Sequence, residues 1–163
     1  MSAESVLQGE GNANFGCFQV DGRFYGLDVA RIREVVRWEP ITPLPKAPSL
    51  IDGVIDLRGA VIPVVNLGRA LDVEEVRGTE KARIVIAEVD GLVVGFCVDA
   101  AVEVLSVDRS LLTDPPLLAT RSGYDVMDAV LRREGELPVL VVSLESLLEL
   151  VHSAADEPRE AMA

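Results

Sequence analysis

The sequence predicts an all-β fold of two small five-stranded barrels, followed by a short C-terminal helix. Three features lead to this prediction: a recurring hairpin signal, an internal repeat and a leucine-spaced segment near the end of the chain. The chain has 163 residues, of which 49% are hydrophobic, so it is long enough to bury one sizeable core. A single twisted antiparallel sheet that carries a duplicated segment is the alternative architecture.

Three pairs of short apolar segments are each joined by two residues that suit a tight hairpin turn. A glycine occupies the second turn position in every pair, and glycine tolerates the positive φ that such turns require. The sequence therefore predicts three hairpins. They are Phe15–Val20 with Arg23–Asp28 around Asp21-Gly22, Gly53–Leu57 with Ala60–Leu67 around Arg58-Gly59, and Arg83–Val89 with Leu92–Val98 around Asp90-Gly91.

The chain also repeats itself. Val20–Val36 aligns with Val89–Leu105 without a gap, and the two segments share seven identical residues over seventeen positions. A looser repeat relates Ile62–Leu71 to Leu137–Leu148, because each passes from Ile/Leu-Pro-Val into a leucine-spaced turn or helix. Both halves thus begin and end alike, with about five short strands each, and closing each half into a barrel would leave no exposed sheet edge.

Composition divides the chain into a folded region and two tails. The two ends are small and polar or acidic, so they are expected to be flexible, and Ser143 is the expected cap of a terminal helix. We expect a tail at 1–14, a folded region at 15–151 and an acidic tail at 152–163. Within the folded region, the first barrel is expected at about 15–81, the second at about 82–142 and the helix at 144–151. Exchange of strands between the two barrels is possible.

The charge of the chain limits the partners that it can bind. The 27 acidic and 15 basic residues leave a formal net charge of −12, which repels nucleic acid and anionic lipid surfaces. The first residues contain neither a basic segment nor a long apolar one, so the chain is expected to be cytoplasmic and not inserted in a membrane. Cys17 and Cys97 lie far apart in apolar segments, and both are expected to be buried free thiols.

The sequence nominates no catalytic or metal-binding cluster. His152 is the single histidine, and no cysteine or carboxylate cluster stands beside it. Phosphate-binding loops and the G-x-S-x-G and C-x-x-C motifs are absent. The chain is therefore expected to bind other proteins without a cofactor or metal, and not to be an enzyme. Three carboxylate pairs lie in polar segments where hydration is the expected explanation: Glu74 with Glu75, Glu134 with Glu136, and Asp125 with Asp128.

Four charged residues stand inside otherwise apolar segments: Glu34, Arg58, Asp99 and Glu103. A buried charge without a partner is strongly destabilising, so each of them must reach solvent or form a pair. Glu34 with Arg58 is the natural pair. The alternative is that Arg58 is only the exposed first residue of a hairpin turn, and the residues alone favour neither possibility.

Four motifs in a fixed order resemble the CheW family of chemotaxis coupling proteins. They are I-R-E-V at Ile32–Val35, T-P-L-P at Thr42–Pro45, I-D-G-V-I-D-L-R-G-A-V-I-P-V-V at Ile51–Val65 and G-F-C-V-D-A-A-V-E-V at Gly95–Val104. The third block is the most specific, and the resemblance covers roughly residues 15–150. It implies a fold of two SH3-like barrels, with neither a cofactor nor a catalytic residue.

The resemblance also implies partners and site residues. A CheW-like adaptor would link the cytoplasmic tip of a chemoreceptor to the regulatory domain of a CheA-type histidine kinase at membrane receptor arrays, where ring assembly is an option. It implies a pair of Glu34 with Arg58, and kinase-contacting surfaces on both barrels, the second through residues 83–104. The receptor-binding residues, in a groove between the barrels, would be Val35, Gly53, Val54, Arg58 and Gly95.

The chain departs from the family pattern at three places. Asp56 and Asn66 exchange the usual Asn and Asp, which is expected to preserve a mutual hydrogen bond. Thr113 and Leu118 stand where some members of the family have a basic residue and an aromatic residue at the kinase and array interface. The segment Tyr124–Gly135 replaces a glycine-containing segment, so the choice of receptor or kinase is expected to differ.

Two other functions stay open on the sequence alone. A divergent member of the family would serve gliding, pilus or developmental signalling and bind its kinase weakly, which the departures at Thr113 and Leu118 favour. A small barrel that binds a peptide or another ligand is a candidate from a different class, because an apolar cleft is expected between two barrels.

Overall fold

The computed structural model of the chain describes residues 11–115 and 126–154, and strands dominate them. The predicted all-β fold with a C-terminal helix is confirmed. The strands are β1 (Asn12–Val20), β2 (Arg23–Asp28), β3 (Ile32–Arg37), β4 (Ile51–Leu57), β5 (Ala60–Asn66), β6 (Arg83–Val89), β7 (Leu92–Val98), β8 (Ala100–Asp108), β9 (Leu112–Thr113), β10 (Met127–Leu131) and β11 (Val139–Val142). The helical segments are η1 (Val29–Arg31), α2 (Leu67–Ala70), η2 (Arg109–Leu111) and α3 (Leu144–Ala154).

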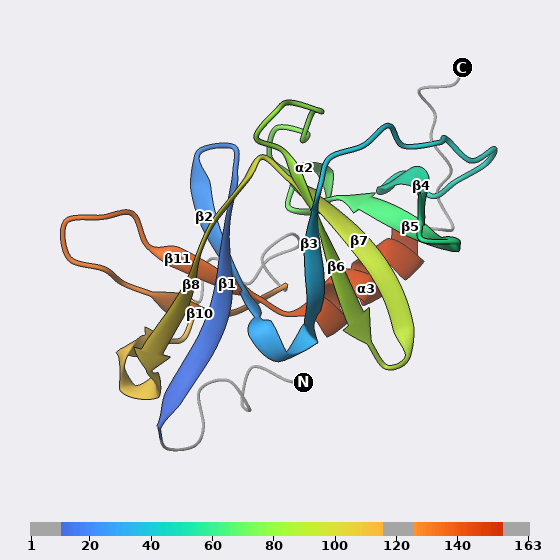
Figure 1. Ribbon diagram of the computed structural model, residues 1–163. Coiled ribbons are helices and arrows are strands. Elements are labelled where there is room, and N and C mark those ends of the chain that lie inside the picture. The colour runs from blue at the N-terminus through green and yellow to red at the C-terminus, as the bar shows by residue number, and fades with distance from the viewer. Residues whose placement is uncertain (1–10, 116–125, 155–163) are drawn as a thin grey trace.

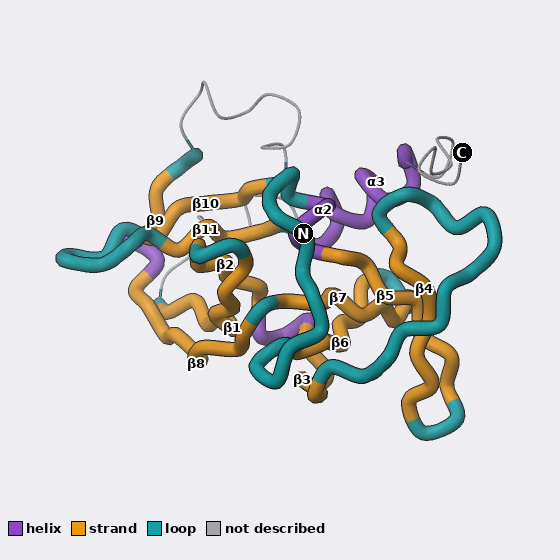
Figure 2. The backbone as a smooth tube through the Cα atoms, turned by 90° about the horizontal axis from the view of Figure 1, so that it is seen from above, coloured by secondary structure: helices purple, strands orange, loops and turns teal. Residues whose placement is uncertain are grey.

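The strands form two sheets that lie side by side (Figure 1). Sheet A has six strands in the order β8-β1-β2-β11-β10-β9, and sheet B has five in the order β3-β6-β7-β5-β4. Neighbouring strands are antiparallel except for β2 with β11 and β5 with β7, which are parallel. Seen from above, α2 and α3 lie together on one side of the molecule (Figure 2).

The two sheets do not follow the expected boundary near residue 82. The first repeat supplies β1, β2 and β3, and the second supplies β6, β7 and β8, but β3 pairs with β6 while β8 pairs with β1. Neither connection, η1 in the first repeat or Asp99 in the second, reverses the chain into a hairpin, so each third strand continues into the other sheet. The strand exchange that the sequence left possible is therefore present: the two repeats exchange their third strands across the boundary expected near residue 82.

The looser repeat has a structural counterpart in both sheets. In sheet B, β5 runs parallel to β7 and leads into α2, and in sheet A, β11 runs parallel to β2 and leads into α3. Val64 pairs with Gly95, and Val141 pairs with Gly26. These two glycines are aligned by the stricter repeat, so the two sheets are built on one plan.

One hydrophobic core is shared by the two sheets. A smaller cluster around Phe15 lies within sheet A, on the other face of β1 and β2. The main cluster joins strands of both sheets to α3, so each sheet is stabilised by burial against the other. Its members include Phe18, Val20, Tyr25 and Leu27 of sheet A, Ile84, Ile86 and Phe96 of sheet B, and Leu144 and Leu147 of α3.

The predicted hairpin turns are present in the structure. Asp21-Gly22, Arg58-Gly59 and Asp90-Gly91 all have positive φ at both positions. The expected N-terminal tail is too long, because β1 begins at Asn12 and Ala13 is buried, and α3 ends three residues later than expected, at Ala154. None of the helices in the described residues is long and apolar enough to cross a membrane.

Both cysteines are buried free thiols, as predicted. Cys17 lies on β1 in sheet A and Cys97 on β7 in sheet B. Burial is the main cause that raises the pKa of Cys97 to about 12, with a contribution from the carboxylate of Asp52. The Cys97 thiol is therefore unreactive in the folded chain at neutral pH.

Candidate functional site

The predicted pair of Glu34 and Arg58 is present. Glu34 lies on β3, Arg58 lies in the turn between β4 and β5, and Arg58 Nη2 donates to Glu34 Oε2. This hydrogen bond raises the pKa of Arg58, which keeps its charge. Because β3 and β4 are the opposite edges of sheet B, the pair shows that the sheet curls until its edges approach each other. Arg58 is thus both a turn residue and an ion-pair partner.

Three of the predicted site residues belong to one row across sheet B. A Cβ atom at Gly95 would lie 2.9 Å from Ile84 Cγ2, and one at Gly53 would lie 2.0 Å from the carbonyl oxygen of Thr42. Both glycines are buried, so they permit close packing on this face and offer no side chain to a partner. The row consists of the directly paired residues Glu34, Ile86, Gly95, Val64 and Gly53.

Val35 and Val54 lie on the opposite face of sheet B, because side chains alternate along a strand. Val35 is exposed and Val54 is half-buried. On this face Val54 pairs with Pro63 and Asp56 pairs with Val61, and Val61 is 69% exposed. We call these four residues of β4 and β5 the hairpin patch. Val61, which the sequence did not nominate, is exposed next to the buried Ile62 on β5.

All five predicted receptor-binding residues lie in sheet B or in its β4–β5 turn. A groove between the two sheets would also need side chains from sheet A, and none of the five comes from it. Within residues 83–104, β6 and β7 are inner strands of sheet B and largely buried. Only β8 is an outer strand, where Val102 and Val104 are 42% and 67% exposed. A partner would therefore reach this region through β8.

The other predicted interface residues lie at the far end of sheet A. Thr113 is on β9, and its hydroxyl donates to the carbonyl oxygen of Val130 at 3.2 Å. Leu118 lies outside the described residues, as do the first two residues of the segment Tyr124–Gly135. The same segment contains β10, so this departure from the family pattern supplies an inner strand of sheet A.

The expected hydrogen bond between Asp56 and Asn66 is absent. Asp56 Oδ1 instead accepts from the backbone N–H of Gly59 at 2.8 Å, and Asn66 Nδ2 donates to Asp52 Oδ2 at 2.9 Å. Asp56 is near the turn and Asn66 is at the far end of β5, so the two side chains lie at opposite ends of the hairpin. The prediction chose the wrong aspartate of β4.

The other acidic residues named from the sequence, and His152, are mostly exposed. Glu74, Glu75, Glu134 and Glu136 are exposed, as expected, and so is His152. Within the described parts of the chain, no group of three or more His, Cys, Asp and Glu residues could hold a metal ion. Asp125 lies outside the described residues. Asp128 was expected to be hydrated, but this expectation is wrong, because it lies on β10 and is only 6% exposed.

Comparison with known proteins matches residues 14–152 to the CheW-like domain. The chemotaxis protein CheW of Rhizobium meliloti (strain 1021) is 33% identical over 130 residues, which cover 80% of this chain and 83% of that protein. Protein FrzA of Myxococcus xanthus is 26% identical over 150 residues, which cover 92% of this chain and 94% of that protein. The crystal structure of the scaffolding protein TtCheW from Thermoanaerobacter tengcongensis superposes with a TM-score of 0.74 at 29% identity, and the match covers 83% and 86% of the two chains. The chain therefore belongs to the CheW-like family, whose members are scaffold and adaptor proteins and not enzymes.

Proposed function

We propose that this chain couples the cytoplasmic tips of chemoreceptors to a CheA-type histidine kinase at membrane receptor arrays. Membership of the CheW-like family supports the class of function. The observation that carries the finer proposal is the pair of Glu34 with Arg58, which ties together the two edges of sheet B beside the exposed hairpin patch. The pair and the patch form a polar and apolar surface at one end of the sheet, suitable for binding another protein.

Two separate surfaces would let the chain hold two partners at once. The hairpin patch on sheet B is assigned to the receptor, and the outer strand β8 on sheet A is assigned to the kinase. Each surface is small, so each contact is weak by itself, and repetition of the contacts in an array supplies the avidity. In this arrangement, a signal passes as a change in the relative placement of receptor and kinase.

The receptor surface is tested by adding a charge to the hairpin patch. We expect Val61→Asp and Val54→Asp, each made as a separate variant, to reduce retention of a receptor cytoplasmic fragment in a pull-down by at least several-fold. Val61 is the safer site, because its exposed side chain contributes little to the core. Val104→Asp, which adds the same charge at an exposed position of β8, is the matched control and should leave receptor retention unchanged.

Circular dichroism of each variant establishes that it is folded before the pull-down is interpreted. Unchanged retention by folded Val61→Asp and Val54→Asp variants would remove the hairpin patch from the receptor surface. The Val104→Asp control would then be tested against the kinase, since a loss of kinase binding is its expected effect.

A second candidate is an adaptor of a pathway other than swimming chemotaxis, such as gliding, pilus or developmental signalling, with weak kinase binding. The similarity to Protein FrzA of Myxococcus xanthus is the observation that fits it. Co-purification from cells separates the two candidates. A stoichiometric kinase supports the first, and a receptor without stable kinase supports the second.

A further inference from the structure

Asp52 and Asp128 occupy equivalent places in the two halves of the fold. The pairing of β4 with β5 shifts by one residue at Asp52, and the pairing of β10 with β11 shifts by one residue at Asp128. Just before each bulge, a backbone carbonyl accepts a hydrogen bond from the residue that caps the following helix. These bonds run from Asn66 N to Leu50 O at 3.0 Å and from Ser143 N to Val126 O at 2.7 Å.

The two aspartates differ in what neutralises them. Asp52 accepts from the guanidinium of Arg69, the third residue after the cap Asn66, so its charge is paired within its own half. The third residue after the cap Ser143 is Ser146, which carries no charge. Among the described residues, no hydrogen bond or ion pair is formed by the carboxylate of Asp128. The second half therefore keeps the acid of the first half but has an uncharged serine in place of its arginine.

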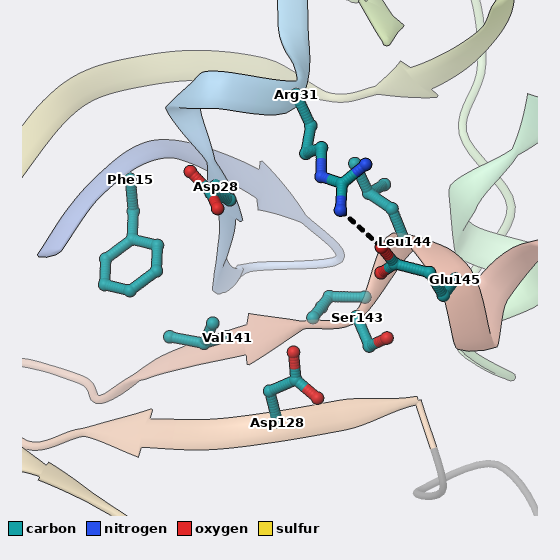
Figure 3. A pocket seen from close by; sticks show the side chains of 9 residues that line it. Phe15, Asp28, Arg31, Asp128, Val141, Ser143, Leu144 and Glu145 are labelled. Atoms are coloured by element: carbon teal, nitrogen blue, oxygen red, sulfur yellow. Dashed lines mark hydrogen bonds and ion pairs between the residues drawn. The ribbon is translucent and has the colours of Figure 1, made fainter. Parts of the chain in front are cut away.

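Asp128 lines a small pocket between sheet A, η1 and the start of α3 (Figure 3). The other charged groups that line this pocket among the described residues already have partners. Arg31 donates to Glu145 at 2.7 Å, and Asp28 Oδ1 accepts from the backbone N–H of Ala30 at 3.0 Å. Figure 3 shows the Asp128 carboxylate directed from β10 toward the neighbouring strand that carries Val141 and leads to Ser143. It is 94% buried and aimed into the pocket without a partner among these groups.

The size and lining of the pocket restrict what can fill it. The volume open to the centre of a water molecule is about 20 Å³, which is roughly the room for one water or one ammonium group. Phe15, Val141 and Leu144 form an apolar part of the wall, which suits a methylene stem. Burial, with Glu145 nearby, raises the pKa of Asp128 to about 6, so the carboxylate is charged at neutral pH and a cation would relieve the cost of burying it.

We propose that the Asp128 pocket is a binding site for a single ammonium group with N–H donors, occupying the place that the Arg69 guanidinium fills in the other half. A lysine side chain of a partner protein and a free ammonium ion present the same chemistry to this site. The pocket lies on sheet A and contains no residue of the hairpin patch or of the Glu34–Arg58 pair. Ammonium binding at this pocket can therefore be tested independently of receptor binding.

The test is a titration of the ¹⁵N-labelled chain with n-butylammonium chloride, followed by two-dimensional NMR at a pH above 7. We expect saturable shifts of the backbone amides of Asp128, Ser143 and Glu145. Asp128→Asn should abolish them, whereas Glu149→Gln, which removes one charge from the exposed face of α3, should leave them unchanged. Tetramethylammonium, which has the charge but no N–H donor, should produce no saturable shift at these amides.

Ammonium chloride distinguishes the two sources of the group. Tighter binding of n-butylammonium than of ammonium assigns the site to a lysine side chain, because the stem then contributes, and equal affinity assigns it to a free ion. Ser146→Arg provides a second test, since it supplies in the second half the residue that Arg69 provides in the first. This variant should lose butylammonium binding and lower the pKa of Asp128. Absence of saturable shifts in the unmodified chain, or their persistence in Asp128→Asn, would overturn the proposal and leave a pocket for water.

Discussion

At the scale of single residues, Arg58 occupies a position of a hairpin turn where an arginine is not a favoured residue. Its φ of 51° lies in the left-handed region, where Asn, Asp and Gly are favoured over long side chains. The other two predicted hairpins have aspartates, Asp21 and Asp90, at the same position. Backbone conformations of this kind persist where the surroundings impose them and concentrate at functional sites. The bond to Glu34 gives Arg58 a role that turn formation does not explain.

Reversal of one charge in this pair should impair kinase coupling, and reversal of both should partly restore it. Arg58→Glu places two carboxylates together, whereas Arg58→Glu combined with Glu34→Arg recreates an opposite pair. We expect a several-fold loss and a partial recovery of receptor-dependent kinase autophosphorylation in reconstituted arrays. Because Arg58 is largely exposed, the midpoint of thermal unfolding should change little in either variant.

The pair of Arg33 and Glu88 is the matched control for this double-mutant cycle. It joins β3 to β6 at 2.9 Å and is also largely exposed, but it includes no residue of the β4–β5 turn. The same reversals there should leave coupling unchanged. A cycle at Glu34 and Arg58 that shows no coupling energy would remove the pair from the proposed function.

Asp128 predicts how the stability of the chain depends on pH. Burial, with a further contribution from Glu145, raises its pKa from 3.8 to about 6, and Asp28 and Arg31 are the other charged groups that line its pocket among the described residues. Between these two values the folded chain holds a proton that the unfolded chain has lost. The stabilisation is therefore complete below about pH 4 and is lost as the pH rises through about 6.

Asp128→Asn should prevent this loss of stability at neutral pH, because the amide stays neutral at every pH. At about 1.4 kcal/mol for each pH unit between the two pKa values, the variant should be more stable at neutral pH by at most about 3 kcal/mol. The advantage should vanish near pH 4. Urea unfolding at both pH values measures it, and an equal difference at the two would show that Asp128 does not titrate in this range.

At the scale of elements, the sequence predicted hairpins well and the partners of strands less well. Asp-Gly and Arg-Gly turns are local signals, and all three predicted turns are present. The exchange of β3 and β8 depends on pairing between residues far apart in the chain. Local sequence patterns do not indicate such pairing. Asp128 was expected to be hydrated because its neighbours are polar, but a bulge between Met127 and Ala129 gives it an unpaired, inward position. The residues alone left open whether Arg58 pairs with Glu34 or is only an exposed turn residue, and the structure shows that it is both.

The two helix caps should differ in their contribution to stability. Asn66 caps α2, is 2% exposed, and also binds both the N–H and the carbonyl of Val76 at 3.0 Å. Asn66→Ala leaves these groups unpaired and should cost about 3 kcal/mol of unfolding free energy. Ser143 accepts one bond at the start of α3, from Ser146 N at 3.2 Å, so Ser143→Ala should cost about 1 kcal/mol. Chemical denaturation compares the two, and equal costs would contradict the role assigned to the Val76 bonds.

At the scale of the whole molecule, the exchange of strands joins the two halves into one structure. The chain passes from sheet A to sheet B between β2 and β3, and returns between β7 and β8. The main core contains side chains of both sheets, so separation of the sheets would expose large apolar surfaces on each. A fold assembled in this way is expected to lack a half that is stable by itself.

Unfolding of the chain should therefore be a single cooperative transition, and its two cysteines are natural probes for it. Cys17 in sheet A and Cys97 in sheet B are each 1% exposed, so a thiol reagent reaches either of them only when its sheet opens. Pulses of such a reagent along a urea series should label both at the same midpoint, which should also match the fluorescence of Trp38, the single tryptophan. Variants with one cysteine changed to alanine assign the signal to each sheet. Labelling of Cys17 at a clearly lower urea concentration than Cys97 would show instead that sheet A opens while sheet B remains folded.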